Sequence, residues 1–231
     1  ANPFQISAAA APFSLDAAKF RAVEAIRQHG RQSRTGIADL IGYSPSKMTS
    51  VVNELMDEGV LAETGEGTAT GGRRARSIDF NPDFGYFVGA TVEASRLDIA
   101  LVDFSGRIRV RLLLPAPVTA TPQAILDSIC GFILERLTKL DIPLDKIYGF
   151  GLTTPVPLEP SSGTLYESAD LPGWGGYQIH SQLREVFPYG VVVIEKDANA
   201  MAYGELRRGR VNTDSFVFLK SEPPISAGIV I

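Results

Sequence analysis

The stretch that decides the fold of the first part of the chain is residues 33–59, which read SRTGIADLIGYSPSKMTSVVNELMDEG. Apolar residues recur at helical spacing on both sides of Gly42, and a glycine at that point permits a tight turn. Ser44 followed by Pro45 is a strong helix start, because the hydroxyl caps the free amides and proline fits the first helical position. Two helices joined by a four-residue turn indicate a helix-turn-helix.

Around this stretch we predict three short helices, over residues 16–28, 33–41 and 44–57, each with one apolar face turned to a common core. Gly59 ends the third helix. The residues predicted to face inward are Phe20, Val23, Ala25 and Ile26 in the first helix, Ile37, Leu40 and Ile41 in the second, and Met48, Val51, Val52 and Leu55 in the third.

The other side of the third helix is polar and suits DNA. Short hydrogen-bonding side chains and one cation match the base edges and phosphates of a major groove. A solvated helix face that binds nothing would have the same composition. The candidate DNA-binding residues of this helix and its cap are Ser44, Ser46, Lys47, Thr49, Ser50 and Asn53.

A β-hairpin is predicted directly after the third helix. Strand-like segments at 60–63 and 76–80 flank a glycine- and threonine-rich loop that starts at Thr64 and runs to Gly72. Arg73, Arg74 and Arg76 follow within four residues. Cations on the rim of such a wing reach phosphates or the adjacent minor groove. These three arginines complete the candidate DNA-binding set.

Composition excludes several classes of protein. The net charge of −4 argues against a protein that coats nucleic acid indiscriminately, although residues 17–80 hold nine basic and eight acidic side chains. One cysteine, Cys130, and two histidines far apart in sequence leave little for a disulfide or a metal site, so we predict no metal or cofactor. Cys130 lies on an apolar face and is interpreted as a buried thiol. No apolar run approaches the ~20 residues of a membrane span, and a reducing cytoplasm fits this composition.

Residues 81–231 are predicted to form an α/β domain, because strand-like and helical segments alternate. We therefore divide the chain into a flexible arm (1–16), a winged helix-turn-helix (17–80) and this second domain (81–231). Predicted strands cover 86–90, 97–103, 107–114, 146–151, 191–194 and 216–219; predicted helices cover 123–140, 177–187 and 196–208; residues 171–176 form a loop.

Four motifs, in order along the chain, resemble those of the ROK family of repressors and sugar kinases. The resemblance runs from about residue 19 to the end, and it implies a winged helix followed by an actin-like, ribonuclease-H-like domain that binds ligand and dimerises. The motifs are GGRRA at 71–75, GLTTPVPLEPSSG at 151–163, LPGW at 171–174 and EKDANA at 195–200.

The resemblance also implies which residues a kinase of this family would need, and the chain departs from them. A D-x-G-G-T phosphate loop aligns with 91–95, where Thr91 replaces the aspartate and Glu93 a glycine. A G-T-G-x-G loop aligns with 221–225, where Glu222 and two prolines stand. Phosphate loops need glycines and free amides. We therefore predict no catalytic residues and no enzyme activity; the rival hypothesis is a sugar kinase with an N-terminal extension.

By resemblance, Asp197 is the residue that contacts a sugar hydroxyl, and Asp170 and Lys196 replace two asparagines of the sugar pocket. Asp197 either accepts a hydrogen bond from a sugar or caps the helix that follows it. Asp170 and Lys196 either pair with each other or indicate a charged ligand such as a sugar phosphate. A domain that binds no sugar and serves only for dimerisation is a further alternative. Trp174 and nearby Tyr177 either stack on a sugar or anchor the core.

Together these patterns predict a repressor of sugar-related genes that binds operator DNA as a homodimer or higher homo-oligomer, with a sugar or sugar-phosphate effector. A module whose winged helix contacts another protein is the remaining alternative, and the arginines of the wing disfavour it. In the family the second half of the domain continues beyond the point that corresponds to Ile231, so we expect this chain to be a fragment.

Overall fold

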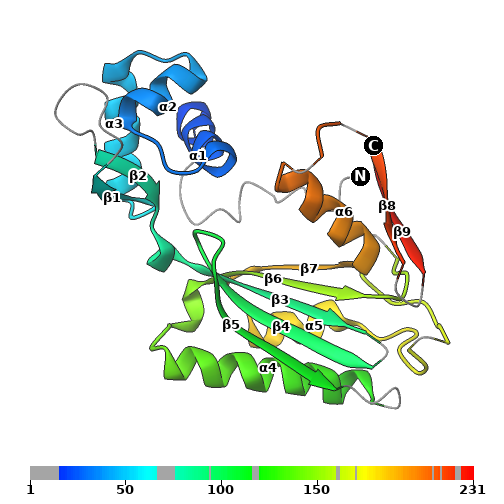
Figure 1. Ribbon diagram of the computed structural model, residues 1–231. Helices are drawn as coiled ribbons and strands as arrows, with labels where there is room; N and C mark the ends of the chain where they lie inside the picture. The colour runs from blue at the N-terminus through cyan, green and yellow to red at the C-terminus, as the bar shows by residue number, and fades with distance from the viewer. Residues whose placement is uncertain are drawn as a thin grey trace. The chain divides into compact units, whose positions relative to one another are not determined.

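The computed structural model describes residues 16–66, 76–93, 95–115, 120–159, 162–169, 171–209, 211–213, 215–221 and 225–231. The chain divides into two compact units, which can be followed by colour in Figure 1. The first unit reaches to Phe84 and includes the turn Asp103–Arg107, and the second contains Gly85–Val102 and Ile108–Ile231. Each unit has a core of its own.

Three helices begin the first unit: α1 (Ala17–His29), α2 (Arg34–Ile41) and α3 (Pro45–Asp57). The side chains of Asp16, Ser33 and Ser44 each accept a hydrogen bond from a first-turn amide, which is why the helices start there. Gly42 and Gly59 take the left-handed φ angles of 72° and 79° that the chain needs to leave α2 and α3. The predicted helix-turn-helix is therefore confirmed.

Two of the residues predicted to face inward lie on the surface instead. Phe20 is 53% exposed and Leu40 is 45% exposed. The buried face of α1 contains Ala22 and Lys19. The Nζ atom of Lys19 lies 2.6 Å from the Glu58 carboxylate. At 3.6 residues per turn, Phe20 falls on the opposite side of α1 from these buried residues. The four residues predicted to face inward in α3 are all buried.

The wing is an antiparallel pair, β1 (Leu61–Glu66) and β2 (Arg76–Phe80), in which Glu63 lies opposite Ile78. The backbone of Gln32 adds a short third element, since it exchanges two hydrogen bonds with Ile78 at 3.0 and 2.7 Å. The prediction that the loop starts at Thr64 is wrong, because backbone pairing with β2 continues to Glu66 across a bulge. A 3-10 turn, Pro82–Phe84, follows β2 along the chain. The ring of Phe84 packs against the ring of Phe104, and the two ring centroids lie 4.8 Å apart.

The second unit is built on a five-stranded sheet, and its alternation of strands and helices confirms the predicted α/β class. Its strand order is β5-β4-β3-β6-β7. Strand β6 pairs in parallel with both β3 and β7, whereas β4 and β5 are antiparallel. The strands are β3 (Tyr86–Val92), β4 (Arg96–Asp103), β5 (Ile108–Pro115), β6 (Ile147–Thr154) and β7 (Val191–Lys196).

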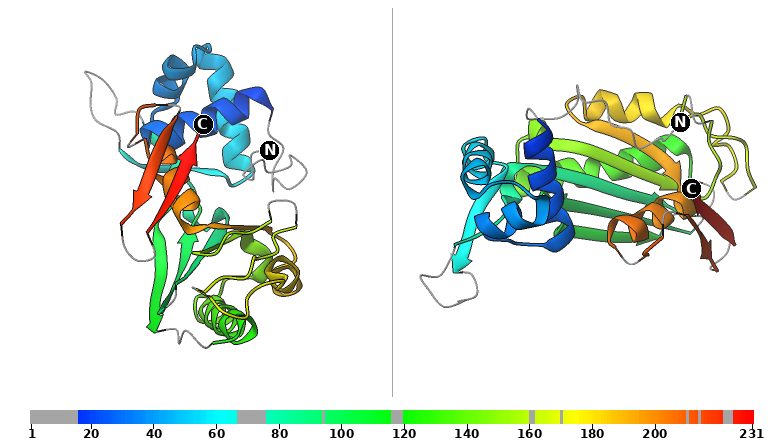
Figure 2. Two further views of the ribbon diagram at one scale, coloured as in Figure 1. Left: turned by 90° about the vertical axis from the view of Figure 1, so that its right-hand side faces the viewer. Right: turned by 90° about the horizontal axis from the view of Figure 1, so that it is seen from above.

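Helices cover both faces of this sheet. Helices α4 (Pro122–Lys139) and α5 (Ile179–Val186) lie on one face and α6 (Asp197–Arg207) on the other (Figures 1 and 2). A 3-10 turn, Leu144–Lys146, leads into β6. Apolar side chains of the sheet and of α4 and α5 form one continuous core, in which the rings of Phe150 and Phe187 lie 5.0 Å apart.

A hairpin of β8 (Phe216–Lys220) and β9 (Ser226–Val230) packs against α6. Its approach is close, because a Cβ atom on Gly228 would lie 2.1 Å from the carbonyl oxygen of Ala198. The opposite side of the hairpin is apolar and exposed, with Leu219 72% exposed. The local sequence of β9 gives only a weak strand signal, because alanine and glycine are poor strand formers.

Candidate nucleic-acid interface and ligand site

The polar face predicted for α3 is present on the first unit. An α-helix repeats every 3.6 residues, so the spacing that buries four apolar residues of α3 turns its polar residues to solvent. The exposed polar residues are Ser46, Lys47, Thr49, Ser50 and Asn53.

The hydroxyl groups near this face have local partners but keep capacity for a ligand. Ser44 Oγ caps α3. Thr49 Oγ1 donates to the carbonyl oxygen of Pro45 at 2.8 Å, and Ser50 Oγ donates to Glu54 Oε1 at 3.2 Å. A hydroxyl that donates one hydrogen bond can still accept others. Thr49 and Ser50 can therefore accept from donors on a nucleic acid.

Lys47 makes a cation–π contact with the ring of Tyr43, a residue that was not predicted to belong to this site. Its Nζ lies 4.2 Å from the centre of the Tyr43 ring, and the guanidinium of Arg21 lies 5.8 Å from the same centre. Such a cation–π contact restricts the side chain but leaves the charge available to a phosphate. The signal that could have found Tyr43 is its position in the turn, one residue before the cap of α3.

A polar network joins α2, α3 and the wing. Arg34 Nη1 lies 3.0 Å from Glu63 Oε1, and Arg34 Nη2 donates to Asn53 Oδ1 at 3.2 Å. Arg76 Nη1 lies 2.5 Å from Glu63 Oε2. The hydrogen bonds from Arg76 and then from Arg34 hold the pKa of the Glu63 carboxyl below its usual value. The structure thus connects two predicted residues, Asn53 and Arg76, through two that were not predicted.

Arg76 stands at the start of β2, and its side chain is 70% exposed. Arg73 and Arg74 lie outside the described residues, so their place on the wing stays a prediction. The carboxylate of Glu63 could not have been assigned to this site from sequence, because β1 meets α2 only in the folded chain.

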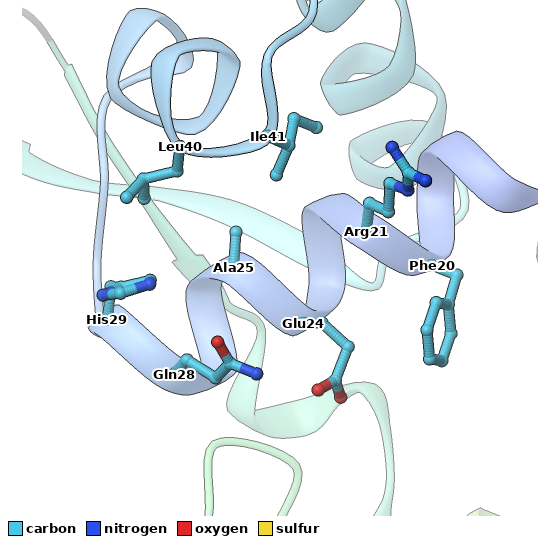
Figure 3. Close-up of a pocket in the computed structure, with 8 residues that line it drawn as sticks. All are labelled: Phe20, Arg21, Glu24, Ala25, Gln28, His29, Leu40 and Ile41. Atoms are coloured by element: carbon cyan, nitrogen blue, oxygen red, sulfur yellow. The ribbon is translucent and has the colours of Figure 1, made fainter. Parts of the chain in front are cut away.

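A surface groove of about 330 Å³ lies between α1 and α2 (Figure 3). Phe20 and Leu40, the two apolar residues that the helical pattern placed in the core, line it together with Ala25 and Ile41. Residues of the polar face of α3 do not line this groove. The two exposed apolar side chains thus line one groove, which is separate from the residues of the candidate nucleic-acid interface.

In the second unit, Asp197 lies at the junction of β7 and α6 and is 1% exposed. Its Oδ1 accepts from the amide of Ala198 at 2.7 Å, and its Oδ2 lies 2.6 Å from Nζ of Lys220, which is 7% exposed. Lys196 holds the N-cap position of α6, but the Asp197 carboxylate accepts from a first-turn amide of this helix, as the helix-cap alternative expected. The carboxylate is therefore engaged in a buried ion pair that links α6 to β8. No short-range sequence pattern predicts this pair, because Asp197 and Lys220 are 23 residues apart in the chain.

Residues 91–95 align with the first phosphate loop of a kinase, and here the side chains of Thr91 and Glu93 already have partners. Thr153 Oγ1 donates to Thr91 Oγ1 at 3.0 Å across β6 and β3. Glu93 pairs with Arg96, whose Nε lies 2.9 Å from the carboxylate. Glu222 and the two prolines of the second segment lie outside the described residues.

Lys196 is half-buried at the carboxyl end of β7, in register with Thr154 at the end of β6. Ligands of open α/β sheets bind at such strand ends. Asp170 lies outside the described residues, so its pairing with Lys196 stays a prediction.

The loop that holds the LPGW motif is anchored from within. Trp174 is 1% exposed, which confirms the interpretation as a core anchor. Both carboxylate oxygens of Glu167 accept backbone amides, from Gly173 and Gly175, at 3.0 Å each. Tyr177 Oη donates to Gln123 on α4 at 2.7 Å. Glu167 was not predicted, and it shapes the turn that follows Asp170.

Three further properties concern the chemistry of the chain. Burial raises the pKa of the half-buried Cys130 thiol to about 11, which does not suit a nucleophile. Among the residues that the structure describes, no three His, Cys, Asp or Glu side chains gather as metal ligands. Within the same residues, no helix is long and apolar enough to cross a lipid bilayer.

Two known families match this chain: the ROK family over residues 88–231 and the winged helix-turn-helix DNA-binding family over residues 15–62. The xylose repressor of Bacillus subtilis (strain 168) is 29% identical over 204 residues, which are 86% of this chain and 51% of that protein. The chain thus spans about half the length of the curated relatives it matches.

Solved structures show the same fold. The crystal structure of a ROK family transcriptional regulator, a homolog of the E. coli MLC protein, has a TM-score of 0.66 at 19% identity and covers 92% of this chain and 54% of its own. A ROK family glucokinase from Streptomyces griseus, in complex with glucose and AMPPNP, has a TM-score of 0.53 at 22% identity, with 64% and 45% covered. These likenesses confirm the predicted architecture. Because the ROK family matches more than half of its residues, this chain belongs to the ROK family.

Proposed function

We propose that this protein is a sequence-specific DNA-binding transcriptional regulator that represses sugar-related genes. The observation that carries the proposal is α3, whose exposed face is formed by hydrogen-bonding side chains in a winged helix-turn-helix. Such a face can read base edges without burying a charge unpaired. The relation to a xylose repressor supports repression and sugar-related target genes.

In this proposal α3 enters the major groove and the wing holds the phosphate backbone or the adjacent minor groove. The cation–π contact of Lys47 and the exposure of Arg76 support their roles at phosphates. The proposed DNA-binding residues are Ser44, Ser46, Lys47, Thr49, Ser50 and Asn53 around α3, and Arg73, Arg74 and Arg76 in the wing.

We propose further that the second unit binds a carbohydrate-type effector, a sugar or a sugar phosphate, at Asp170, Lys196 and Asp197. The location of Lys196 and Asp197 at the end of β7 supports this site. Lys220 neutralises Asp197, so the charge of Lys196 favours an effector with an anionic group. Effector binding would shift the affinity for DNA by favouring one arrangement of the DNA-binding domains in the homo-oligomer.

The second candidate function is a ROK-type sugar kinase with an N-terminal extension, and the fold shared with a glucokinase favours it. Two features support a protein that is not an enzyme. A general base must accept a proton from the sugar hydroxyl, whereas Asp197 already pairs with Lys220. Glu93 stands where a kinase of this family has a phosphate-loop glycine, and its backbone amide already donates to the carbonyl oxygen of Arg96 at 2.9 Å. A coupled ATP-hydrolysis assay with a panel of sugars should therefore give no sugar-dependent turnover, and turnover would contradict the proposal.

We also propose a cytoplasmic homodimer or higher homo-oligomer, with a flexible arm at 1–16, a DNA-binding domain at 17–80 and a ligand and dimerisation domain at 81–231. The small size of the first unit supports self-association. A single DNA-binding domain buries little protein–DNA interface, whereas a symmetric pair of domains binds two half-sites. Light scattering after size-exclusion chromatography measures the oligomeric state, and a monomer at micromolar concentration would contradict this part.

The main test is fluorescence anisotropy of the whole protein on DNA from its own promoter and on a scrambled duplex, at two salt concentrations. We expect a preference of about a hundredfold, ~2.7 kcal/mol, for the promoter. Replacing both Arg73 and Arg74 by alanine should lower the affinity and flatten its salt dependence. Equal binding of both duplexes at both salt concentrations would contradict a specific regulator.

A further inference from the structure

Arg34 is placed where it can influence how α3 presents its side chains. It is the first residue of α2, its side chain is 26% exposed, and it contacts two other elements. Its Nη1 lies 3.0 Å from Glu63 in β1, and its Nη2 donates to Asn53 Oδ1 at 3.2 Å and to Met56 Sδ at 3.4 Å in α3. One guanidinium therefore bridges α3 and β1.

Glu63 completes the network by taking one arginine on each carboxylate oxygen. Oε1 is paired with Arg34 and Oε2 with Arg76. The carboxylate is 25% exposed, whereas the Arg76 side chain is 70% exposed. Two guanidinium groups and one carboxylate leave a net charge of +1, with Arg76 on the solvent side.

From this geometry we propose that Arg34 and Glu63 are positioning residues for DNA recognition: Arg34 orients the amide of Asn53, and Glu63 limits sequence-independent attraction of the wing to phosphates. The inference rests on the proposed function, and it names residues that act through Asn53 and Arg76 rather than residues that touch DNA.

The role of Arg34 follows from the chemistry of an amide. Because Asn53 Oδ1 accepts from Arg34, the Nδ2 group is the end turned to other partners, and it can only donate. In a major groove this end matches an acceptor on a base edge. Without Arg34 the amide can rotate by a half-turn and present its oxygen, so discrimination at that base pair should fall.

The role of Glu63 is electrostatic. Phosphate contacts supply affinity without sequence information. A carboxylate next to Arg76 opposes this attraction for every sequence alike, so it raises the share of the affinity that depends on base contacts. Removal of its charge should therefore tighten binding to every duplex by the same factor and leave discrimination unchanged.

The experiment compares Glu63→Gln with Glu24→Gln in the whole protein. Glu24 is a matched control, since it also pairs with an arginine, Arg27, at 2.7 Å, but it lies on α1 and outside the network. We expect Glu63→Gln to bind a scrambled duplex several-fold more tightly at low salt and to steepen the log–log salt slope by about 0.9, the value for one further phosphate. Because this gain is the same for every sequence, the ratio of promoter to scrambled affinity should stay as in the wild type, and Glu24→Gln should leave the slope and the affinity for either duplex unchanged.

Arg34→Lys is the second variant, because lysine keeps the charge but cannot bridge Glu63 and Asn53 as a planar fork does. We expect an unchanged salt slope and a promoter-to-scrambled ratio lowered at least about fivefold, the lower end for one base contact. A ratio equal to that of the wild type, or a loss of affinity by the same factor on both duplexes, overturns the role of Arg34.

The outcomes separate this inference from the proposed function. Wild-type protein without a preference for promoter DNA contradicts the proposed function itself. Wild-type preference together with a Glu63→Gln salt slope equal to that of Glu24→Gln contradicts only the role of Glu63.

Discussion

Replacing Lys220 by methionine removes the ammonium that neutralises Asp197 inside the second unit. The two side chains are 7% and 1% exposed, and the charged atoms lie 2.6 Å apart. Methionine keeps the unbranched aliphatic chain, so the change acts mainly on the charge. Loss of one partner of a buried pair costs about 3–5 kcal/mol, because the remaining carboxylate has neither its partner nor water. At ~1.4 kcal/mol per factor of ten, the folding equilibrium constant should fall by roughly 10²–10⁴.

Urea unfolding followed by fluorescence measures this loss directly, because Trp174 is the sole tryptophan and is buried in the second unit. The matched control is Lys139→Met, which breaks a pair with Glu135 whose side chains are 57% and 50% exposed. An exposed pair four residues apart on a helix contributes only about 0.3–0.5 kcal/mol, so this variant should unfold near the wild-type midpoint.

The double variant Lys220→Met with Asp197→Asn tests the mechanism. It removes both charges, and it should recover most of the stability lost in the single variant. The reasoning is refuted if Lys220→Met costs no more than Lys139→Met. It is also refuted if the double variant loses the sum of the two single losses, since independent sites would give that result.

Two further predictions concern the packing of the second unit. Gly228→Ala should destabilise this unit by about 1–3 kcal/mol or more, because the new methyl group meets the Ala198 carbonyl. Gly204→Ala is the control: its methyl group meets nothing within 4 Å, so it should stabilise α6 by up to about 1 kcal/mol. Equal urea midpoints for the two variants would refute the close approach of Gly228 to Ala198. Cys130, whose pKa burial raises from 9.0 to about 11, should react with a thiol reagent at pH 8 about a hundredfold more slowly than in the unfolded chain. Since the unfolded thiol loses its proton first, stability should fall as the pH rises from 9 towards 11; equal reaction rates in native and urea-unfolded protein would contradict this burial.

Local signals predicted most elements of the fold. The caps of α2 and α3 and the proline at the start of α3 fixed their first residues, because such signals act within a few residues of the helix end. The errors arose where the answer depended on a partner. Periodicity placed Phe20 and Leu40 in the core, yet α1 buries the face that holds Ala22 and Ile26, and α2 buries Ile37 and Ala38. The composition of β9 is too weak to predict a strand, and its pairing with β8 provides the missing stabilisation.

For the candidate DNA interface, the sequence supplied the residues of the exposed face of α3, since burial of one helix face determines the other. It did not supply Arg34 and Glu63. Their contacts connect α2 to β1 and β1 to β2, and no local pattern records which charged side chains from three elements come together.

The sequence by itself determined the winged helix-turn-helix, the α/β class of the second unit and the resemblance to the ROK family, because these depend on short-range spacing and motifs. Only the tertiary structure decided the state of Asp197. The resemblance of its motif left two roles open, a contact to a sugar hydroxyl or a cap of the following helix, whereas packing of the β8–β9 hairpin against α6 brings Lys220 to within 2.6 Å of it. The physical reason is that a buried carboxylate takes its partner from whichever segment packs against it, and that segment is chosen by the fold and not by neighbours in the chain.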